Sequence, residues 1–402
     1  MNVYIESGGC TRRKLDALKF RSYFEKNGYG FAPGPDQADY ILVTTCAFRK
    51  EEEEASLKLL DSYRSCRGKV VVYGCLPVVA PSRYMRKFDY DFIAPADFEK
   101  VDSHFPKIAH PFAEVADPNL LRHQRQIYAS ETAGKGGAAA LLQGSARYVR
   151  NKYLGSPPRY HLITSRGCLG SCSYCALRFA IGPVQSKPVG AIVEDFARGI
   201  EAGYRDFSIL GDDVGAYGQD RGTGLPDLFA ALLAEAQKKR SGTADNARNT
   251  LRLHVREIKP SWVIRYRKEL EQVLRHRNFS TILCPLQSGS DRILSLMNRG
   301  NDSATIGNAL TALKAGNPRL KIDTQIMVGF PSETEREFEQ TLEQMAGLPL
   351  HAVTISRYRE REGTPARQIE PKVPEAVITE RVKKAGKFLR QHCIRSAVSC
   401  TQ

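Results

Sequence analysis

The chain has 402 residues, of which 42% are hydrophobic and 26% are charged. This length allows two or three domains, and the composition is that of an ordinary soluble protein rather than a disordered one. No apolar run approaches the length of a membrane span, and the N-terminus lacks the basic and apolar regions of a signal peptide. We therefore expect a cytoplasmic protein that does not associate with a membrane.

The formal net charge is +15, and the excess of basic residues is uneven. Residues 121–160 carry seven Lys or Arg against one Asp or Glu, and residues 356–402 carry eleven against five. Such segments can meet RNA phosphates or an acidic peptide, although charge of this kind also simply keeps proteins soluble.

The first hundred residues repeat one local pattern three times. Short apolar or β-branched runs predict strands at Asn2–Glu6, Tyr40–Thr44 and Lys69–Tyr73, and helical patterns such as Glu51–Leu60 lie between them. Alternating strands and helices predict a parallel sheet with right-handed crossovers.

A cysteine follows each of these three strands, namely Cys10, Cys46 and Cys75. The carboxyl ends of parallel strands share one edge of the sheet, so the three thiols are predicted to converge there. The alternative is that they are ordinary buried core cysteines.

Residues 126–158 are rich in Gly, Ala and Ser and read as a linker, with a short helix allowed at Ala138–Leu142. Strands and helices alternate again beyond it. The predicted strands are Tyr160–Thr164, Phe207–Leu210, Leu251–Val255, Thr281–Leu283, Lys321–Val328 and Ala352–Ser356. The predicted helices include Ile192–Ala202, Leu225–Lys238 and Glu375–Ile394. Six β/α units predict an open (β/α)6 barrel rather than a closed eightfold one.

Cys168, Cys172 and Cys175 form a C-x3-C-x2-C pattern just after the first strand of this barrel. Three closely spaced thiolates can hold three irons of a 4Fe–4S cluster and leave the fourth iron open for a ligand. Zinc is the alternative, but it usually takes four ligands, and no fourth Cys or His lies nearby in the sequence. The remaining cysteines have no partner pattern and are interpreted as ordinary thiols: Cys66, Cys284, Cys393 and Cys400.

Taken together, the two cysteine triplets resemble those of the radical S-adenosylmethionine (SAM) methylthiotransferases, which modify tRNA or ribosomal protein S12. The resemblance runs from residue 1 to about 390 and rests on ordered blocks around the cysteines and at later strand ends. These blocks are Gly9-Cys10 with Asp16, Thr45–Phe48, Gly74–Leu76, Arg166–Cys175, Leu210–Gly218, Pro285–Ser290, Met297–Gly300, Gly329–Pro331 with Glu333-Thr334, and Gly363–Ala366.

The resemblance implies an α/β protein with an N-terminal flavodoxin-like parallel-sheet domain, followed by an open (β/α)6 radical SAM partial TIM barrel. It implies domains at 1–125, 159–370 and a helical tail at 371–402, joined by the 126–158 linker. It also implies S-adenosylmethionine and two 4Fe–4S clusters as cofactors. Cys168, Cys172 and Cys175 would hold the catalytic cluster, and Cys10, Cys46 and Cys75 an auxiliary one. In the family, one S-adenosylmethionine methylates a cluster-bound sulfur and a second supplies the radical that removes hydrogen from an unactivated C–H.

Contacts to S-adenosylmethionine are expected from residues at the barrel rim, and several have a simpler alternative. Tyr174 would lie beside the adenine or only pack in the core, and Gly211, Asp212 and Asp213 would meet the methionine moiety or ribose or form a plain turn. The other expected contacts are Gln287, Ser288, Ser290, Gly329 and Phe330. Ser290 is also placed to cap a helix, and Ser332 with Glu335 is placed to cap the next one.

The sequence departs from the family pattern at several positions. Arg13 replaces a usual Asn, Thr44-Thr45-Cys46 replaces Asn-Thr-Cys, Ile181-Gly182 replaces Arg-Gly, and Lys187 replaces an Arg. The sequence also ends at Gln402 without the RNA-binding β-barrel (TRAM) domain that usually follows.

From these departures we expect a polypeptide substrate, a peptide or a protein side chain, with tRNA as the alternative. Another radical SAM sulfur insertion or hydrogen abstraction, and a non-catalytic cluster-binding protein, are further alternatives. We also expect an external electron donor such as flavodoxin or ferredoxin, and a monomeric enzyme.

Overall fold

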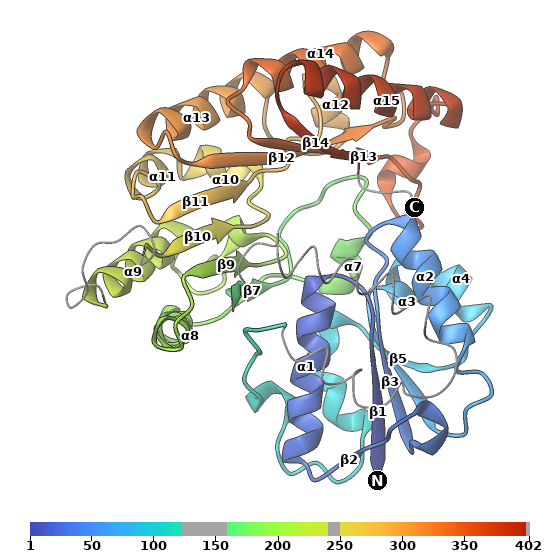
Figure 1. Ribbon diagram of the computed structural model, residues 1–402. Helices are drawn as coiled ribbons and strands as arrows, with labels where there is room; N and C mark the ends of the chain where they lie inside the picture. The colour runs from blue at the N-terminus through green and yellow to red at the C-terminus, as the bar shows by residue number, and fades with distance from the viewer. Residues whose placement is uncertain (122–158, 240–249, 399–402) are drawn as a thin grey trace. The chain divides into compact units, whose positions relative to one another are not determined.

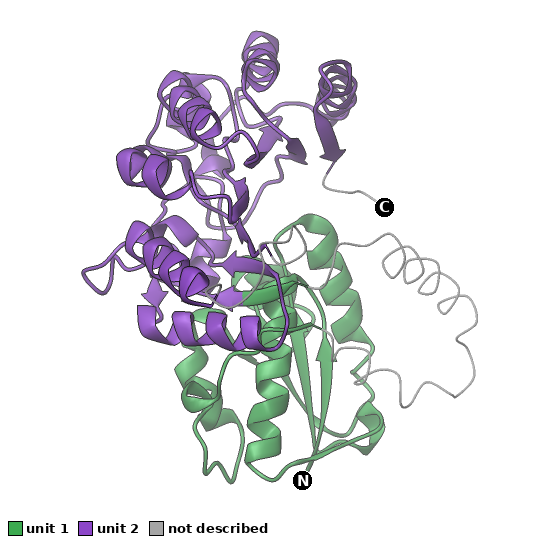
Figure 2. Ribbon diagram, turned by 60° about the vertical axis from the view of Figure 1, so that its left-hand side comes forward, with its two compact units in different colours: residues 1–161 green, residues 162–402 purple. Residues whose placement is uncertain are grey.

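The computed structural model describes residues 1–121, 159–239 and 250–398, and it divides the chain into two compact units, Met1–His161 and Leu162–Gln402. Figure 2 draws the two units in different colours. Within the described ranges, no helix is long and apolar enough to cross a membrane. The predicted linker at 126–158, with its short helix at Ala138–Leu142, lies outside the described residues.

The first unit is built from a parallel sheet with helices between its strands. Its strands are β1 (Asn2–Ser7), β2 (Gly30–Phe31), β3 (Tyr40–Thr45), β4 (Lys69–Gly74) and β5 (Asp91–Ile93). Its α-helices are α1 (Thr11–Lys26), α2 (Lys50–Asp61), α3 (Leu76–Val79) and α4 (Pro81–Met85), and 3-10 segments span Pro35–Gln37, Pro95–His104 and Phe112–Glu114.

The strand order of this sheet is β2-β1-β3-β4-β5, and all pairs are parallel. This is the flavodoxin-like order, so the fold predicted for this half is confirmed. Figure 1 shows α1 and α2 on opposite faces of the sheet. An aromatic cluster from α1, including Phe20, Tyr23 and Phe24, packs with strand residues Leu42 and Tyr73. The two-residue β2 and the three-residue β5 were not predicted, because runs so short carry no periodicity.

The second unit is a curved parallel sheet with helices along its outer side (Figure 1). Its strands are β6 (Tyr160–Ile163), β9 (Asp206–Leu210), β10 (Arg252–Val255), β11 (Phe279–Leu283), β12 (Lys321–Val328), β13 (Ala352–Arg357) and β14 (Arg395–Val398), with a small pair β7 (Ser165–Arg166) and β8 (Gln185–Ser186) beside them. Its α-helices are α7 (Leu177–Ile181), α8 (Val189–Glu201), α9 (Leu225–Lys238), α10 (Pro260–Arg265), α11 (Arg267–Val273), α12 (Asp291–Leu296), α13 (Ser303–Gly316), α14 (Glu335–Gly347) and α15 (Glu375–Gln391). Short 3-10 segments span Val214–Ala216 and Pro365–Gln368.

The main sheet has the strand order β14-β13-β12-β11-β10-β9-β6, which is the sequence order of an open barrel. Each of the six predicted barrel strands is present, with ends that differ by at most two residues. The prediction of a purely helical tail is incomplete, because helix α15 is followed by strand β14, which pairs in parallel with β13. Arg395–Val398 is half exposed and carries no apolar run, so its strand conformation comes from the free edge of β13.

Candidate functional site

The N-terminal cysteines lie at the carboxyl ends of three neighbouring strands. Cys46 and Cys75 directly follow β3 and β4, and Cys10 follows β1 after a Gly-Gly turn and precedes the first residue of α1. Cys46 and Cys75 are buried and Cys10 is exposed. Because β1, β3 and β4 are adjacent in the sheet, the structure brings the three residues to one edge.

Gly74 allows Cys75 to come close to Cys46. Its φ is +146°, and a Cβ atom at this position would lie 2.1 Å from the carbonyl oxygen of Thr45. The next residue, Cys75, donates its backbone N–H to that same oxygen at 3.3 Å. Only a glycine fits so close an approach of β4 to the end of β3.

The sulfur atoms of this group interact electrostatically. The Cys46 thiol donates to the sulfur of Cys10, and this hydrogen bond is the largest cause that lowers the pKa of Cys10, to about 6, and raises the pKa of Cys46. The charge of Cys75 also acts on Cys46. A low pKa favours the thiolate, which is the form that binds iron.

The second triplet, Cys168, Cys172 and Cys175, lies in the loop between β7 and α7. Gly167 has φ +80°, and a Cβ there would lie 1.9 Å from the carbonyl oxygen of Pro183. Its backbone N–H donates to the Asp212 carboxylate at 2.8 Å. The start of the loop is thereby held against the segment that follows β9.

Two blocks distant in sequence hold the rest of the loop. The Ser173 N–H donates to the carbonyl oxygen of Met297 at 3.0 Å, and the Asn298 amide donates to the Ser171 hydroxyl at 2.8 Å. The Ala366 N–H donates to the carbonyl oxygen of Ser173 at 2.9 Å. These contacts explain why the Met297–Gly300 and Gly363–Ala366 blocks accompany the cysteine pattern.

Asp213 is a buried carboxylate beside Cys168. The Cys168 sulfur lies 3.8 Å from Asp213 Oδ2, which also accepts the indole N–H of Trp262 at 2.9 Å. Within the part of the chain that the structure describes, Asp213 Oδ1 is buried without a hydrogen-bond partner. Burial raises the pKa of Asp213, and it raises the pKa of Cys168 to about 12. No local pattern in the sequence singles out Trp262, because its partner is 49 residues away.

Arg299 is a buried cation that contacts the second triplet. Its Nη1 donates to the Cys172 sulfur and to the Tyr174 hydroxyl, each at 3.4 Å, and its Nη2 donates to the Pro285 carbonyl oxygen at 2.5 Å. Burial would raise the pKa of Cys172, but the charges of Arg299 and Lys259 outweigh it and the pKa is lowered. The Tyr174 ring also packs against the cluster that contains Phe330.

The residues after β11 divide into two groups. Gln287 has φ +75°, and its backbone pairs with β12 through Gln325 and Met327. Ser288 and Ser290 instead face α14. The Ser290 hydroxyl caps α12 by accepting the N–H of Ile293 and donates to Glu337 at 3.0 Å.

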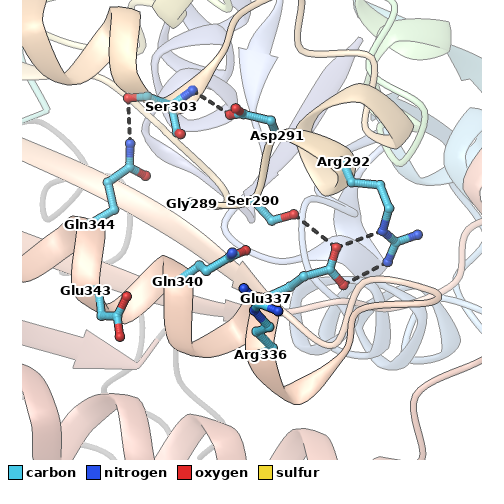
Figure 3. A pocket seen from close by; sticks show the side chains of 10 residues that line it. All are labelled: Gly289, Ser290, Asp291, Arg292, Ser303, Arg336, Glu337, Gln340, Glu343 and Gln344. Carbon is cyan, nitrogen blue, oxygen red and sulfur yellow. Dashed lines mark hydrogen bonds and ion pairs between the residues drawn. The ribbon is translucent and has the colours of Figure 1, made fainter.

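Figure 3 shows the same Ser290 in a polar pocket of about 590 Å³, beside the ion pair of Arg292 with Glu337. None of the six cysteines of the two triplets lines this pocket. Because its hydroxyl proton is donated to Glu337 and one lone pair accepts the N–H of Ile293, Ser290 fits the capping alternative, and we do not carry it forward as a cofactor contact.

The turn after β12 contains Gly329, with φ +81°, and Phe330, whose side chain is fully buried. The Gly329 N–H donates to Glu333 at 2.8 Å. The predicted Ser332 cap is wrong: Thr334 caps α14, and Glu337 completes the capping box. Ser332 has φ +65°, a conformation that takes it out of the capping position.

Comparisons with known protein families agree with this geometry. Residues 162–345 match the radical SAM superfamily, and residues 2–94 match the uncharacterized protein family UPF0004. The chain is 29% identical over 387 residues to a threonylcarbamoyladenosine tRNA methylthiotransferase (MtaB) of Thermotoga maritima, which covers 94% of this chain and 80% of that protein. It is 27% identical to the threonylcarbamoyladenosine tRNA methylthiotransferase of Danio rerio, over 97% of this chain and 66% of that protein.

A third relative is the tRNA-2-methylthio-N(6)-dimethylallyladenosine synthase of Novosphingobium aromaticivorans, 26% identical over 94% of this chain and 80% of that protein. The chain spans less than two thirds of several animal relatives, for example 64% of the Drosophila melanogaster protein.

Solved structures share the fold. The radical SAM methyltransferase TsrM of Kitasatospora setae superposes with a TM-score of 0.63 at 14% identity, over 91% of this chain and 76% of that one. The cobalamin-dependent radical enzyme OxsB gives a TM-score of 0.55 at 13% identity, over 97% of this chain and 56% of that one.

The curved parallel sheet with its three-cysteine loop defines a radical SAM enzyme. The second cysteine triplet and the family matches over both units then narrow the comparison: the chain resembles the methylthiotransferase-like radical SAM transferases. Enzymes of this family use S-adenosylmethionine and two 4Fe–4S clusters.

The residues present fit these cofactors. In the described ranges, no three His, Cys, Asp or Glu side chains are arranged around a single metal ion, but each cysteine of a 4Fe–4S cluster binds a different iron, so tighter convergence is not needed. The unpartnered, buried Asp213 Oδ1 beside Cys168 suits a cationic group such as the amino group of S-adenosylmethionine. The N-terminal group likewise has a buried atom without a partner among the described residues, Nη1 of Arg13.

Proposed function

We propose that this enzyme transfers a methylthio group to an adenosine of tRNA that already carries a substituent on N6. The relatives that support the proposal are named for two such adenosines, threonylcarbamoyladenosine and dimethylallyladenosine. The polypeptide substrate expected from the sequence receives no support from these relatives, whose named substrates are tRNA nucleosides. The two cysteine triplets, each at strand ends of its own unit, are the observation that carries the reaction class.

The proposed ligands of the two clusters are the two triplets. Cys168, Cys172 and Cys175 hold the cluster that binds S-adenosylmethionine, and Cys10, Cys46 and Cys75 hold the auxiliary cluster. When bound, these cofactors supply a methylated sulfur and a radical that removes hydrogen from the substrate carbon.

The chain's own residues orient these groups. The Asp213 carboxylate accepts a hydrogen bond from the amino group of S-adenosylmethionine, and Trp262 fixes the rotamer of that carboxylate. Asp212 and Gly211 shape the loop beside it, and Asp212 holds the backbone of Gly167. Tyr174, Gln287, Gly329 and Phe330 line the rest of the proposed cofactor site. The Ser288 hydroxyl accepts the N–H of Ser290 and contacts Thr341. Ser288 thereby positions the segment after β11 against α14.

Basic residues on α15 support a nucleic-acid substrate. Lys383, Lys387 and Arg390 are exposed on this helix, and the region 356–402 carries eleven basic against five acidic residues. Lysine and arginine on a surface bind phosphates by releasing counterions, so affinity falls steeply with salt. We expect tRNA binding that weakens as salt increases.

The experiment uses anaerobically reconstituted enzyme, S-adenosylmethionine, a reductant and tRNA that carries either N6-modified adenosine. Digestion and mass spectrometry of the nucleosides should show the gain of one sulfur, one carbon and two hydrogens on the adenosine. Cys168→Ala and Cys75→Ala variants serve as matched inactive controls, and Cys284→Ala, a buried cysteine outside both triplets, should retain activity.

Two results would contradict the proposal. The first is 5′-deoxyadenosine formation without any sulfur in the tRNA, which would indicate hydrogen abstraction alone. The second is methylthiolation of a peptide or protein in cell extract while both tRNA substrates stay unmodified, which would restore the polypeptide expectation.

A further inference from the structure

Arg13 is a fully buried cation at the N-terminal cysteines. It lies in the first turn of α1, three residues after Cys10, and its side chain is 2% exposed. Nη2 forms an ion pair with Asp16 at 3.0 Å, and the guanidinium lies over the ring of Tyr73, 5.3 Å from its centre. Among the described residues, Nη1 has no hydrogen-bond partner.

A buried guanidinium nitrogen without a hydrogen-bond partner destabilises the folded protein, because its N–H groups lose their hydrogen bonds to water and form none in exchange. A guanidinium carries only donors, so the missing partner has to be an acceptor. Asp16 already neutralises one charge but occupies only Nη2. Since no described residue supplies that acceptor, the open Nη1 indicates a bound ligand.

The surroundings of Arg13 locate that ligand. The charges of Cys10 and Cys75 both act on the guanidinium, and Tyr73, which stacks with it, lies two residues before Cys75. A cluster held by Cys10, Cys46 and Cys75 leaves one iron without a protein ligand. A Cβ atom at Gly9 would lie 2.7 Å from the Cβ of Cys46 and 3.4 Å from the Cβ of Arg13. Arg13 is thus placed beside this cysteine group, where an added iron ligand would bind.

The same place favours negative charge for an independent reason. The 16-residue helix α1 begins immediately after Cys10, and no acidic residue lies in its first turn. The backbone N–H groups of Arg12 and Arg13 donate toward the Cys10 sulfur. The positive end of the helix dipole thus adds to the charge of Arg13.

We propose that Arg13 binds a sulfur anion, hydrosulfide or methanethiolate, at the iron that Cys10, Cys46 and Cys75 leave open. The inference rests on the proposed function and deepens it, since it names a residue that holds the sulfur to be transferred. The Nη1–H donates to a lone pair of the anion, and the guanidinium balances its charge. A guanidinium is a charge-assisted donor, which binds an anion more strongly than a neutral amide such as Asn would.

The test isolates the N-terminal cluster in the full chain. In a Cys168→Ala, Cys172→Ala, Cys175→Ala background, the reconstituted protein is titrated with sodium hydrosulfide, and binding is followed by the electron paramagnetic resonance spectrum of the reduced cluster. Arg13→Asn should weaken hydrosulfide binding by about tenfold to a hundredfold, as for loss of a hydrogen bond to a charged group. Arg13→Lys keeps the charge but lacks the planar guanidinium, so its hydrosulfide affinity should lie between that of the parent and that of Arg13→Asn.

Lys19→Met is the matched control, because Lys19 is a buried cation on the same helix with its own carboxylate, Asp117, at 3.2 Å. Its hydrosulfide affinity should equal that of the parent. If Arg13→Asn loses the cluster because Asp16 is left unpaired, the Arg13→Gln, Asp16→Asn double variant removes the whole pair and is compared instead.

Hydrosulfide affinity is measured in whichever variant retains the cluster, Arg13→Asn or the double variant, and in Arg13→Lys if neither of them does. An affinity equal to that of the parent overturns the role of Arg13 and leaves the proposed function intact. A parent protein that binds no iron at Cys10, Cys46 and Cys75 overturns both. A loss of affinity equal to that of Lys19→Met would mean that Arg13 acts only through folding, and it too rejects the proposal.

Discussion

At the scale of single residues, the burial of Asp213 restricts which group can bind its carboxylate. Its Oδ2 is fixed by the Trp262 indole, and its Oδ1 is left buried and unpartnered beside Cys168 within the described ranges. A carboxylate kept in this state is destabilising unless a donor fills the space. The amino group of S-adenosylmethionine is the donor that the proposed function brings there.

Asp213→Asn should therefore weaken S-adenosylmethionine binding by about tenfold or more, the cost of losing a charged hydrogen bond. The iron content should stay unchanged, because Asp213 is no cluster ligand. Binding can be followed by the fluorescence of Trp262, the single tryptophan of the sequence. Asp227→Asn, which alters the capping of α9, is the control, and equal affinities for the two variants would contradict the assignment.

Arg299 acts on the second triplet through charge. Its contact with the Cys172 sulfur favours added negative charge on a cluster at this site. Arg299→Met should lower the reduction potential of that cluster by about 65–130 mV, the value for a one-electron couple if the hydrogen bond is worth 1.5–3 kcal/mol. A redox titration in a Cys10→Ala, Cys46→Ala, Cys75→Ala background measures it. Arg292→Met removes a cation that pairs with Glu337 instead, and an equal shift there would refute the local effect.

At the scale of elements, a polar cluster joins β9 to β10. Asp206 accepts from Arg252 Nε at 2.7 Å and lies 3.2 Å from the His254 ring. Burial acts to raise the pKa of Asp206, but the hydrogen bonds and charges of Arg252 and His254 outweigh it, and the pKa is lowered. A lowered pKa means that the stabilisation is present above the pKa of the unfolded chain, about 4, and is lost as the pH falls below it.

Asp206→Asn should reduce the free energy of unfolding at pH 7 by about 1–3 kcal/mol, less than for a fully buried pair because the Arg252 side chain is 40% exposed. The difference from the wild type should shrink between pH 4 and pH 2. Urea unfolding of the apoprotein followed by Trp262 fluorescence reports on the unit that contains both strands. A difference that stays constant over this pH range would show that the carboxylate charge is not the cause.

At the scale of the whole molecule, each unit carries one complete triplet. The wild-type protein should bind about eight irons after anaerobic reconstitution, and loss of either triplet should leave about four, since each site holds a four-iron cluster. Iron and sulfide analysis of the two triple-alanine variants measures this. Cys284→Ala should match the wild type, because Cys284 is buried outside both triplets. About four irons in the wild type would refute a second cluster.

The sequence alone determined the alternation of strands and helices and the position of each cysteine after a strand. These features depend on local periodicity and on spacing along the chain, so β1, β3, β4 and the six barrel strands could be predicted within two residues. The shortest strands could not, because β2 and β5 are too short for a pattern and β14 forms only against the edge of β13.

Tertiary structure alone decided which side chains share an environment. Trp262 reaches Asp213, Arg299 reaches Cys172, and a buried nitrogen of Arg13 has no partner among the described residues. It also turned Ser290 toward Glu337 and gave the cap of α14 to Thr334. Charge and hydrogen bonding act through space between residues up to 127 positions apart, so neither the partners nor the open atoms can be read from spacing in the sequence.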